Sequence, residues 1–168
     1  INQYKMKILV CISSVPDTTA KISFTPDKKS FVSAGVTYIL NPYDEIALSK
    51  AIDLAGTAGH TVTVLNVGDA TTEPVIRKAL AIGATDAVRI NAAPRDGFFV
   101  ATQIANYVKS NPFDLILCGR ESSDHNGSSV PVMVAEMLGF PCILFAKSLT
   151  VDGTTVTCES EIEGGKEI

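Results

Sequence analysis

Four short runs of apolar and branched residues constrain the fold of this chain more than any other feature. They occupy residues 7–12, 61–65, 87–90 and 115–118, and polar or glycine residues follow each of them. Strands that are covered on both faces read as continuous apolar runs of this length rather than as alternating patterns. The four runs therefore predict the central strands of a parallel sheet.

Segments with helical periodicity separate these runs and carry the start and stop signals of helices. Asn41 can cap a helix whose first turn holds Pro42 and two acidic residues, since proline there costs no hydrogen bond and acids favour the helix dipole. The inward stripe of this helix is expected to contain Ile46, Leu48, Ala51, Ile52 and Ala55, with its end near Gly56 or Gly59. Further helices are expected at about 72–83, from about Asp96 to Asn111-Pro112, and from Ser128-Ser129 to Gly139.

The alternation of strands and helices predicts an α/β fold: a three-layer, doubly wound, mostly parallel sheet of the Rossmann-like kind, forming one domain over residues 1–168. A length of 168 residues and a hydrophobic content of 46% suit a single core, expected over residues 7–147. Two segments depart from the alternation and predict small antiparallel additions. Residues 19–33 contain the turn-forming Thr25-Pro26-Asp27, and residues 149–160 contain Asp152-Gly153, which indicates a hairpin.

Charge and hydropathy exclude several classes of partner. The 14 lysines and arginines against 18 acidic residues give a net charge of −4, so no basic field attracts nucleic acid or anionic lipid. No apolar run reaches the roughly 18 residues of a membrane span, so no direct membrane insertion is expected. The first residues, Ile1 to Lys5, lack the cationic flank and apolar stretch of a secretion signal. These features predict a cytoplasmic protein.

The residues with reactive side chains do not form a recognisable catalytic or metal centre. The four cysteines, Cys11, Cys118, Cys142 and Cys158, are scattered and include no Cys-x-x-Cys pair, which argues against a zinc or dithiol site. Three of them lie in strongly apolar runs and are expected to be small buried hydrophobic residues. With only His60 and His125 besides, a histidine metal site or catalytic triad is hard to assemble, and no enzyme is predicted.

The segment after the fourth apolar run carries the clearest signal for a binding site. In an open α/β sheet a ligand lies beyond the carboxyl ends of the strands. Residues 119–129 form a loop of glycines, serines and charged residues that leads into a helix, whose first-turn amides can bind an anion such as phosphate. The alternative is that Ser128 and Ser129 merely cap the helix and the loop is a solvated connection.

The chain lacks the glycine-rich motifs of two common classes of nucleotide-binding protein. The chain has no Gly-x-Gly-x-x-Gly after the first strand and no Gly-Lys-Ser/Thr pair, which disfavours a dehydrogenase-type dinucleotide fold and a P-loop. An enzyme that activates substrates with ATP is also disfavoured, because Ser13-Ser14-Val15-Pro16 supplies no glycine amides for pyrophosphate.

Several motifs, in their order and spacing, resemble the β (small) subunit of the electron transfer flavoproteins from Lys7 to the end of the chain. They are Val15-Pro16-Asp17, Lys21-Ile22, Asn41-Pro42-Tyr43-Asp44-Glu45-Ile46-Ala47, the segment 79–84, the strand 114–119, the serine-rich loop with its helix, Leu138-Gly139-Phe140-Pro141 and Glu163-Gly164-Gly165. The resemblance implies an adenine nucleotide-binding α/β domain that holds a structural AMP. It also implies a heterodimer with an α subunit that carries the redox FAD, passing electrons from dehydrogenases to the respiratory chain.

The resemblance also assigns residues to the nucleotide. Cys11 would lie against it, Asn41 to Asp44 would border the adenine side, and Val67 would approach from the second strand. Residues 119–130 would wrap the rest, with the phosphate near the start of the helix. The full set of implied contacts is Cys11, Asn41, Pro42, Tyr43, Asp44, Val67, Gly119, Arg120, Asp124, Asn126, Gly127, Ser128, Ser129 and Val130.

Departures from the family pattern leave alternatives open. Ser13-Ser14 stands where a lysine followed by arginine or glutamine is usual, and Ser128-Ser129-Val130 stands where a glutamine-containing triplet is usual. In the electron-bifurcating branch a second FAD replaces AMP, and a universal-stress-protein-like nucleotide-binding module is a further alternative. The chain stops soon after Gly164-Gly165, where the family continues into a docking segment and a carboxyl-terminal arm, so a fragment is expected.

Overall fold

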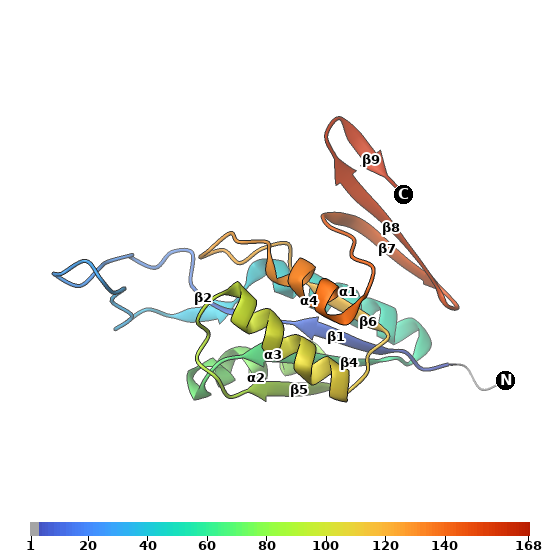
Figure 1. Cartoon of the computed structure of the whole chain (residues 1–168). Coiled ribbons are helices and arrows are strands. Elements are labelled where there is room, and N and C mark those ends of the chain that lie inside the picture. Colours follow the sequence, from blue (N-terminus) through green and yellow to red (C-terminus); the bar gives the residue numbers. More distant parts are fainter. Residues whose placement is uncertain (1–3) are drawn as a thin grey trace.

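The computed structural model describes residues 4–168, except for the side chains of residues 57 and 58. Its centre is a four-stranded sheet in the order β5-β4-β1-β6, and all the strand pairs in it are parallel (Figure 1). The strands are β1 (Lys7–Cys11), β4 (Thr61–Val67), β5 (Asp86–Ile90) and β6 (Leu115–Cys118). Each predicted apolar run is therefore a strand of this sheet, although only β4 and β1 are central and β5 and β6 lie at its edges. Residues 1–3, which include part of the segment tested for a secretion signal, lie outside the described residues.

Two layers of helices cover the sheet. The helices are α1 (Pro42–Ala58), α2 (Glu73–Ile82), which follows a short 3-10 turn η1 (Ala70–Thr72), α3 (Gly97–Ser110) and α4 (Val130–Leu138). Buried side chains of α1 and α2 pack with Ile8, Val10 and Val62 on one face of the sheet. Those of α3 and α4 pack with Leu9 and Leu65 on the other face. The predicted three-layer, doubly wound α/β fold is confirmed.

The predicted inward stripe of α1 is correct except at Ile46. Leu48 and Ala51 are fully buried, whereas Ile46 is 67% exposed. Residues two apart on a helix point about 200° away from each other, so Ile46 lies opposite Leu48. Of the two expected ends, the helix uses Gly59, whose left-handed φ of 67° suits a glycine C-cap.

Antiparallel pairs extend the domain in two places. Strands β2 (Ser14–Pro16) and β3 (Tyr38–Leu40) pair beside the main sheet, and the loop between them projects from the body of the domain (Figure 1). The expected turn forms at its tip, where the Lys28 amide donates to the Thr25 carbonyl at 2.7 Å. The hairpin predicted at 149–160 is confirmed as β7 (Ala146–Asp152) and β8 (Thr155–Ile162), to which β9 (Gly165–Glu167) adds a third strand.

The cysteine prediction is correct for one residue and wrong for another. Cys11 is buried and Cys118 is half-buried, but Cys142 is exposed. Its apolar neighbours 140–145 form no helix or strand and lie on the surface, so the apolar run around Cys142 does not mark a core segment. Within residues 4–168, no helix is long and apolar enough to cross a membrane, and no group of three or more His, Cys, Asp or Glu side chains could hold a metal ion.

Candidate functional site

The strand order places a switch point between β1 and β6. The chain passes from β1 to β4 on one side and later returns to form β6 on the other side of β1. The loops after two such strands diverge and leave a crevice at their carboxyl ends. Cys11 and Cys118 end these two strands in register, and Gly119 opens the loop that was predicted as the binding site. Val67 ends the neighbouring β4.

Asn41 braces this loop from the start of α1. Its side-chain Nδ2 donates to the Glu121 carbonyl at 2.8 Å, and its Oδ1 accepts from the Ser123 amide at 3.3 Å. Asn41 is fully buried. Both polar groups of its side chain are therefore engaged within the protein, and in this conformation Asn41 positions the loop.

Asp44 joins the loops that follow β1 and β6. Its Oδ2 accepts from the Ser13 amide at 2.8 Å and from the Ser13 hydroxyl at 2.6 Å, while its Oδ1 accepts from the Gly119 amide at 3.1 Å. Asp44 is only 6% exposed. Burial raises the pKa of this carboxyl above its ordinary value, although the hydrogen bonds from Ser13 and Gly119 favour the charged form. The carboxylate thus holds both edges of the crevice.

Gly119 permits the loop to approach α1 closely. A Cβ atom at this position would lie 2.7 Å from the backbone nitrogen of Asp44 and 2.7 Å from the carbonyl carbon of Tyr43. Real Cβ atoms essentially never come so near to backbone atoms. The structure shows that glycine is required here by the backbone of α1, and the close approach of a ligand to Gly119 stays a prediction.

The start of α4, where an anion site is predicted, carries no side-chain cap. Ser129 occupies the N-cap position, yet its side chain makes no capping hydrogen bond. The first-turn amides of a helix have no partners within the helix. Asn126 and Ser128 have positive φ values of 49° and 46°, a strained backbone that in non-glycine residues clusters at functional sites. Side-chain capping by Ser129 is therefore not seen, while phosphate binding here and the alternative of a merely solvated loop both stay predictions.

The remaining implied residues take different positions around the crevice. Tyr43 is 37% exposed on the first turn of α1, next to the exposed Pro42. The Arg120 guanidinium stacks on the Phe145 ring at 4.5 Å from its centroid. Asp124 faces His125, with 3.7 Å between the carboxylate and the imidazole. These residues are exposed, whereas Cys11 and Val67 are nearly buried at the ends of their strands.

Sequence reasoning missed several residues that shape this edge of the sheet. Ser13 donates to Asp44, and Ser123 donates to Asn41. Asn66 donates from Nδ2 to the Ile12 carbonyl at 2.9 Å, while its buried Oδ1 has no partner among the described residues. The available signal for Asn66 was an amide side chain between Val64-Leu65 and Val67, at the apolar end of β4. Gly97, at the start of α3, lies so close to α4 that an added Cβ would be 3.2 Å from the Ser129 hydroxyl.

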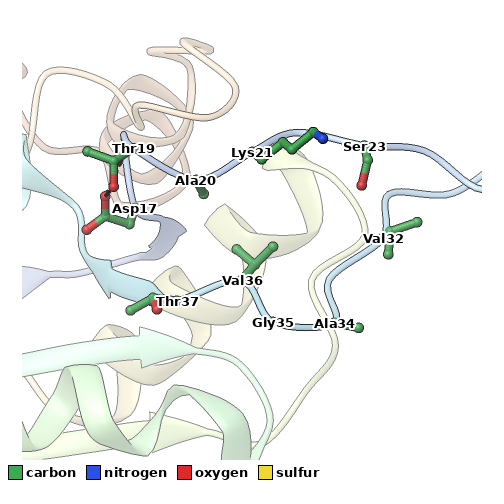
Figure 2. Close-up of a pocket in the computed structure, with 10 residues that line it drawn as sticks. All are labelled: Asp17, Thr19, Ala20, Lys21, Ser23, Val32, Ala34, Gly35, Val36 and Thr37. Carbon is green, nitrogen blue, oxygen red and sulfur yellow. Dashed lines mark hydrogen bonds between the residues drawn. The ribbon is translucent and has the colours of Figure 1, made fainter.

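A cavity of about 370 Å³ lies elsewhere, inside the projecting loop (Figure 2). It opens between the two arms of the loop, beyond the hydrogen bond from the Asp17 amide to the Thr37 carbonyl. Asp17, whose carboxylate accepts from Thr19, lies at one end, and Lys21, Ser23 and Val36 lie along the arms. This cavity contains none of the residues implied in nucleotide binding.

The doubly wound sheet, its switch point and the braced loop that opens α4 place this chain in the class of Rossmann-like, nucleotide-binding α/β domains. Comparison with known proteins gives the particular family. The electron transfer flavoprotein domain matches residues 29–168, and the chain belongs to this family.

Relatives with curated names agree with the resemblance to the β subunit. The chain is 36% identical to an electron transfer flavoprotein subunit β from Syntrophomonas wolfei, over 97% of the chain and 65% of the relative. The human electron transfer flavoprotein subunit β is 30% identical to the chain, over 97% of the chain and 66% of the human protein. The acryloyl-CoA reductase electron transfer subunit γ of Anaerotignum propionicum is 32% identical, over 95% and 62%. The predicted resemblance is confirmed, and the chain spans about two thirds of the length of these relatives.

A solved structure with a similar chain course is the universal stress protein UspA from Lactobacillus plantarum. The two share 16% sequence identity and a TM-score of 0.45, over 84% of this chain and 96% of that one. This likeness is too slight to favour the universal-stress-protein alternative over the family that the sequence matches.

Proposed function

We propose that this chain is the nucleotide-binding part of an electron transfer flavoprotein β subunit, which binds AMP and pairs with an FAD-carrying α subunit. The whole complex would pass electrons from dehydrogenases to the respiratory chain. The observation that carries the proposal is the braced loop 119–130, which opens an α4 with no side-chain cap, in a chain of this family. A cytoplasmic location and the absence of a catalytic centre in the chain itself stay predictions.

The residues present suit an adenosine monophosphate. Ser128, Ser129 and the amide of Val130 would hold the phosphate, because hydroxyls and first-turn amides at a helix start favour an anion. Cys11 and Val67 would form the floor, since both are nearly buried at the strand ends. Asn41, Asp44 and Gly119 would hold the loop in place from beneath, whereas Pro42 and Tyr43 would border the adenine. Contacts from the loop surface would come from Arg120, Asp124, Asn126 and Gly127.

The redox chemistry in this proposal belongs to the FAD of the α subunit. This chain would supply a rigid nucleotide-bound surface for that subunit, and its bound AMP would be structural. FAD in place of AMP stays the alternative, because the serines at 128 and 129 hold a phosphate without distinguishing a mononucleotide from a dinucleotide.

Association with an α subunit tests the pairing half of the proposal. We expect weak, concentration-dependent binding by this chain, since a single domain face resembles a small and transient interface. The experiment mixes the chain with the α subunit of the same genome, and compares the dissociation constant with that of a version extended to the relatives' full length. Equal affinities would show that the additional length is not needed. No binding by either version would refute the pairing, while leaving the nucleotide site to be tested by titration with AMP.

A further inference from the structure

Two cysteines lie side by side on the neighbouring strands β1 and β6, at the carboxyl ends of both. Cys11 ends β1 and Cys118 ends β6, and the parallel register pairs their Cα atoms directly. Both side chains pack in the cluster beneath α3 and α4. The neighbouring Cys118 thiol, together with burial, raises the pKa of Cys11 well above its ordinary value. Both thiols are free in this structure.

We propose that Cys11 and Cys118 form a reversible disulfide, and that its formation weakens nucleotide binding. The effect on nucleotide binding rests on the proposed function. Neighbouring strands lie about 4.8 Å apart, within the roughly 4.4–6.8 Å between the Cα atoms of a disulfide. The Cβ atoms of a disulfide come closer, to about 3.5–4.5 Å. Closing the bond therefore draws the ends of β1 and β6 together, and the resulting strain makes the disulfide easy to reduce.

The loops that follow the two cysteines are packed too closely to move independently of the strand ends. Ser13 and Gly119, which follow the two strand ends, both donate to the buried Asp44 carboxylate, at 2.8 and 3.1 Å. Gly119 already packs against the backbone of α1 with no space for even a Cβ atom. Because close-packed interiors transmit displacement, drawing the strand ends together shifts the loop 119–130 that would hold the nucleotide.

A hydroperoxide supplies the oxidising equivalents. The sulfur of the half-buried Cys118 attacks one oxygen of hydrogen peroxide and becomes a sulfenic acid, while the O–O bond breaks and the other oxygen takes the thiol proton and leaves as water. The Cys11 sulfur then attacks the Cys118 sulfur, the S–S bond forms and a second water leaves, so that two thiols have given two electrons and two protons to one peroxide. A dithiol reductant reverses the step by exchange. Cys118 is the more accessible of the two thiols and the raised pKa of Cys11 disfavours the Cys11 thiolate, so Cys118 meets the oxidant first.

Peptide mapping tests the pairing. The chain is treated with hydrogen peroxide, digested without reductant and analysed by mass spectrometry. We expect a peptide that joins Cys11 to Cys118 and separates again in dithiothreitol. Cys118→Ser should abolish it, and Cys158→Ser, a matched change on β8, should leave it intact. Cys142 is the competitor, because it lies close enough to Cys118 for that thiol to add to the effect of burial on the Cys142 pKa, which is raised. A Cys118–Cys142 peptide in place of the expected one, or no linked peptide, overturns the proposal.

Calorimetric titration with AMP tests the regulation. We expect the oxidised chain to bind AMP roughly tenfold more weakly than the reduced chain, the size of a modest coupling between sites. Peroxide should leave the affinity of Cys118→Ser unchanged. Equal affinity of the oxidised and reduced wild-type chains overturns the regulatory half. A mapped disulfide in a chain that never binds AMP refutes the proposed nucleotide function and the regulation together, while the disulfide itself stands.

Discussion

Replacing Gly119 by alanine perturbs the contact on which the crevice depends. The added methyl would lie 2.7 Å from two backbone atoms of α1, so the loop must move away from Asp44. Overpacking of this kind costs about 1–3 kcal/mol. The movement also weakens the 3.1 Å hydrogen bond from the Gly119 amide to the Asp44 carboxylate, and a hydrogen bond to a charged group contributes about 1.5–3 kcal/mol. We therefore expect Gly119→Ala to lower the free energy of unfolding by about 2–5 kcal/mol.

Urea unfolding followed by circular dichroism measures this loss. Gly127→Ala is the matched control, because it lies in the same loop and an added Cβ there would meet only the Ser129 hydroxyl, at an ordinary 3.9 Å. A surface change of that kind should stay within about 0.5 kcal/mol of the wild type. Equal unfolding midpoints for the two variants would refute the inference that Gly119 is required by its packing against α1.

Three other predictions concern the nucleotide and the buried carboxylate. The double variant Ser128→Ala/Ser129→Ala should weaken AMP binding by roughly 2–4 kcal/mol in calorimetry, since two donors to a charged group are lost. The control Ser148→Ala, at an exposed serine, should leave AMP binding unchanged. Unchanged affinity of the double variant would place the phosphate elsewhere. Burial raises the folded pKa of Asp44 above the unfolded value of about 4, so its contribution to stability is greatest below that value and falls as pH rises through the folded pKa. Asp44→Asn should remove the Asp44 contribution to the pH dependence of stability, measured by urea unfolding at several pH values above 4. Parallel plots of unfolding free energy against pH for the wild type and the variant would contradict this. The isolated chain should show no flavin absorbance, and a yellow purified chain would favour FAD in the site.

The central fold was predictable because its signals are local. Continuous branched apolar runs mark strands that are covered on both faces, and Asn41-Pro42 and Gly59 mark the ends of α1 within a few residues of sequence. Ile46 was placed wrongly because its apolar side chain was counted with the stripe although its helical phase points outward. Cys142 was misplaced for a related reason, since an apolar run alone does not show whether it is covered.

The hydrogen bonds by which Asn41 and Asp44 hold the loop after β6 could not be predicted from the local sequence pattern. Asn41 and Asp44 bond to Glu121 and Gly119, residues 75 to 80 positions away, and such contacts arise only when β1 and β6 become neighbours. The sequence indicated the right segments through the family resemblance, but it associated Asn41, Asp44 and Gly119 with the ligand. The structure adds a supporting role for these residues, which depends on burial and on backbone proximity, and their contact with a nucleotide stays a prediction.

The identity of the nucleotide released on denaturing the purified protein tests the central claim most directly. The protein is purified in the presence of its α subunit, denatured, and its small molecules are separated by liquid chromatography and identified by mass spectrometry. The account predicts AMP in a ratio of one per chain, together with the FAD of the α subunit. Two FAD molecules per heterodimer and no AMP would replace the proposed ligand, and no nucleotide beyond the FAD of the α subunit would contradict a nucleotide site at residues 119–130.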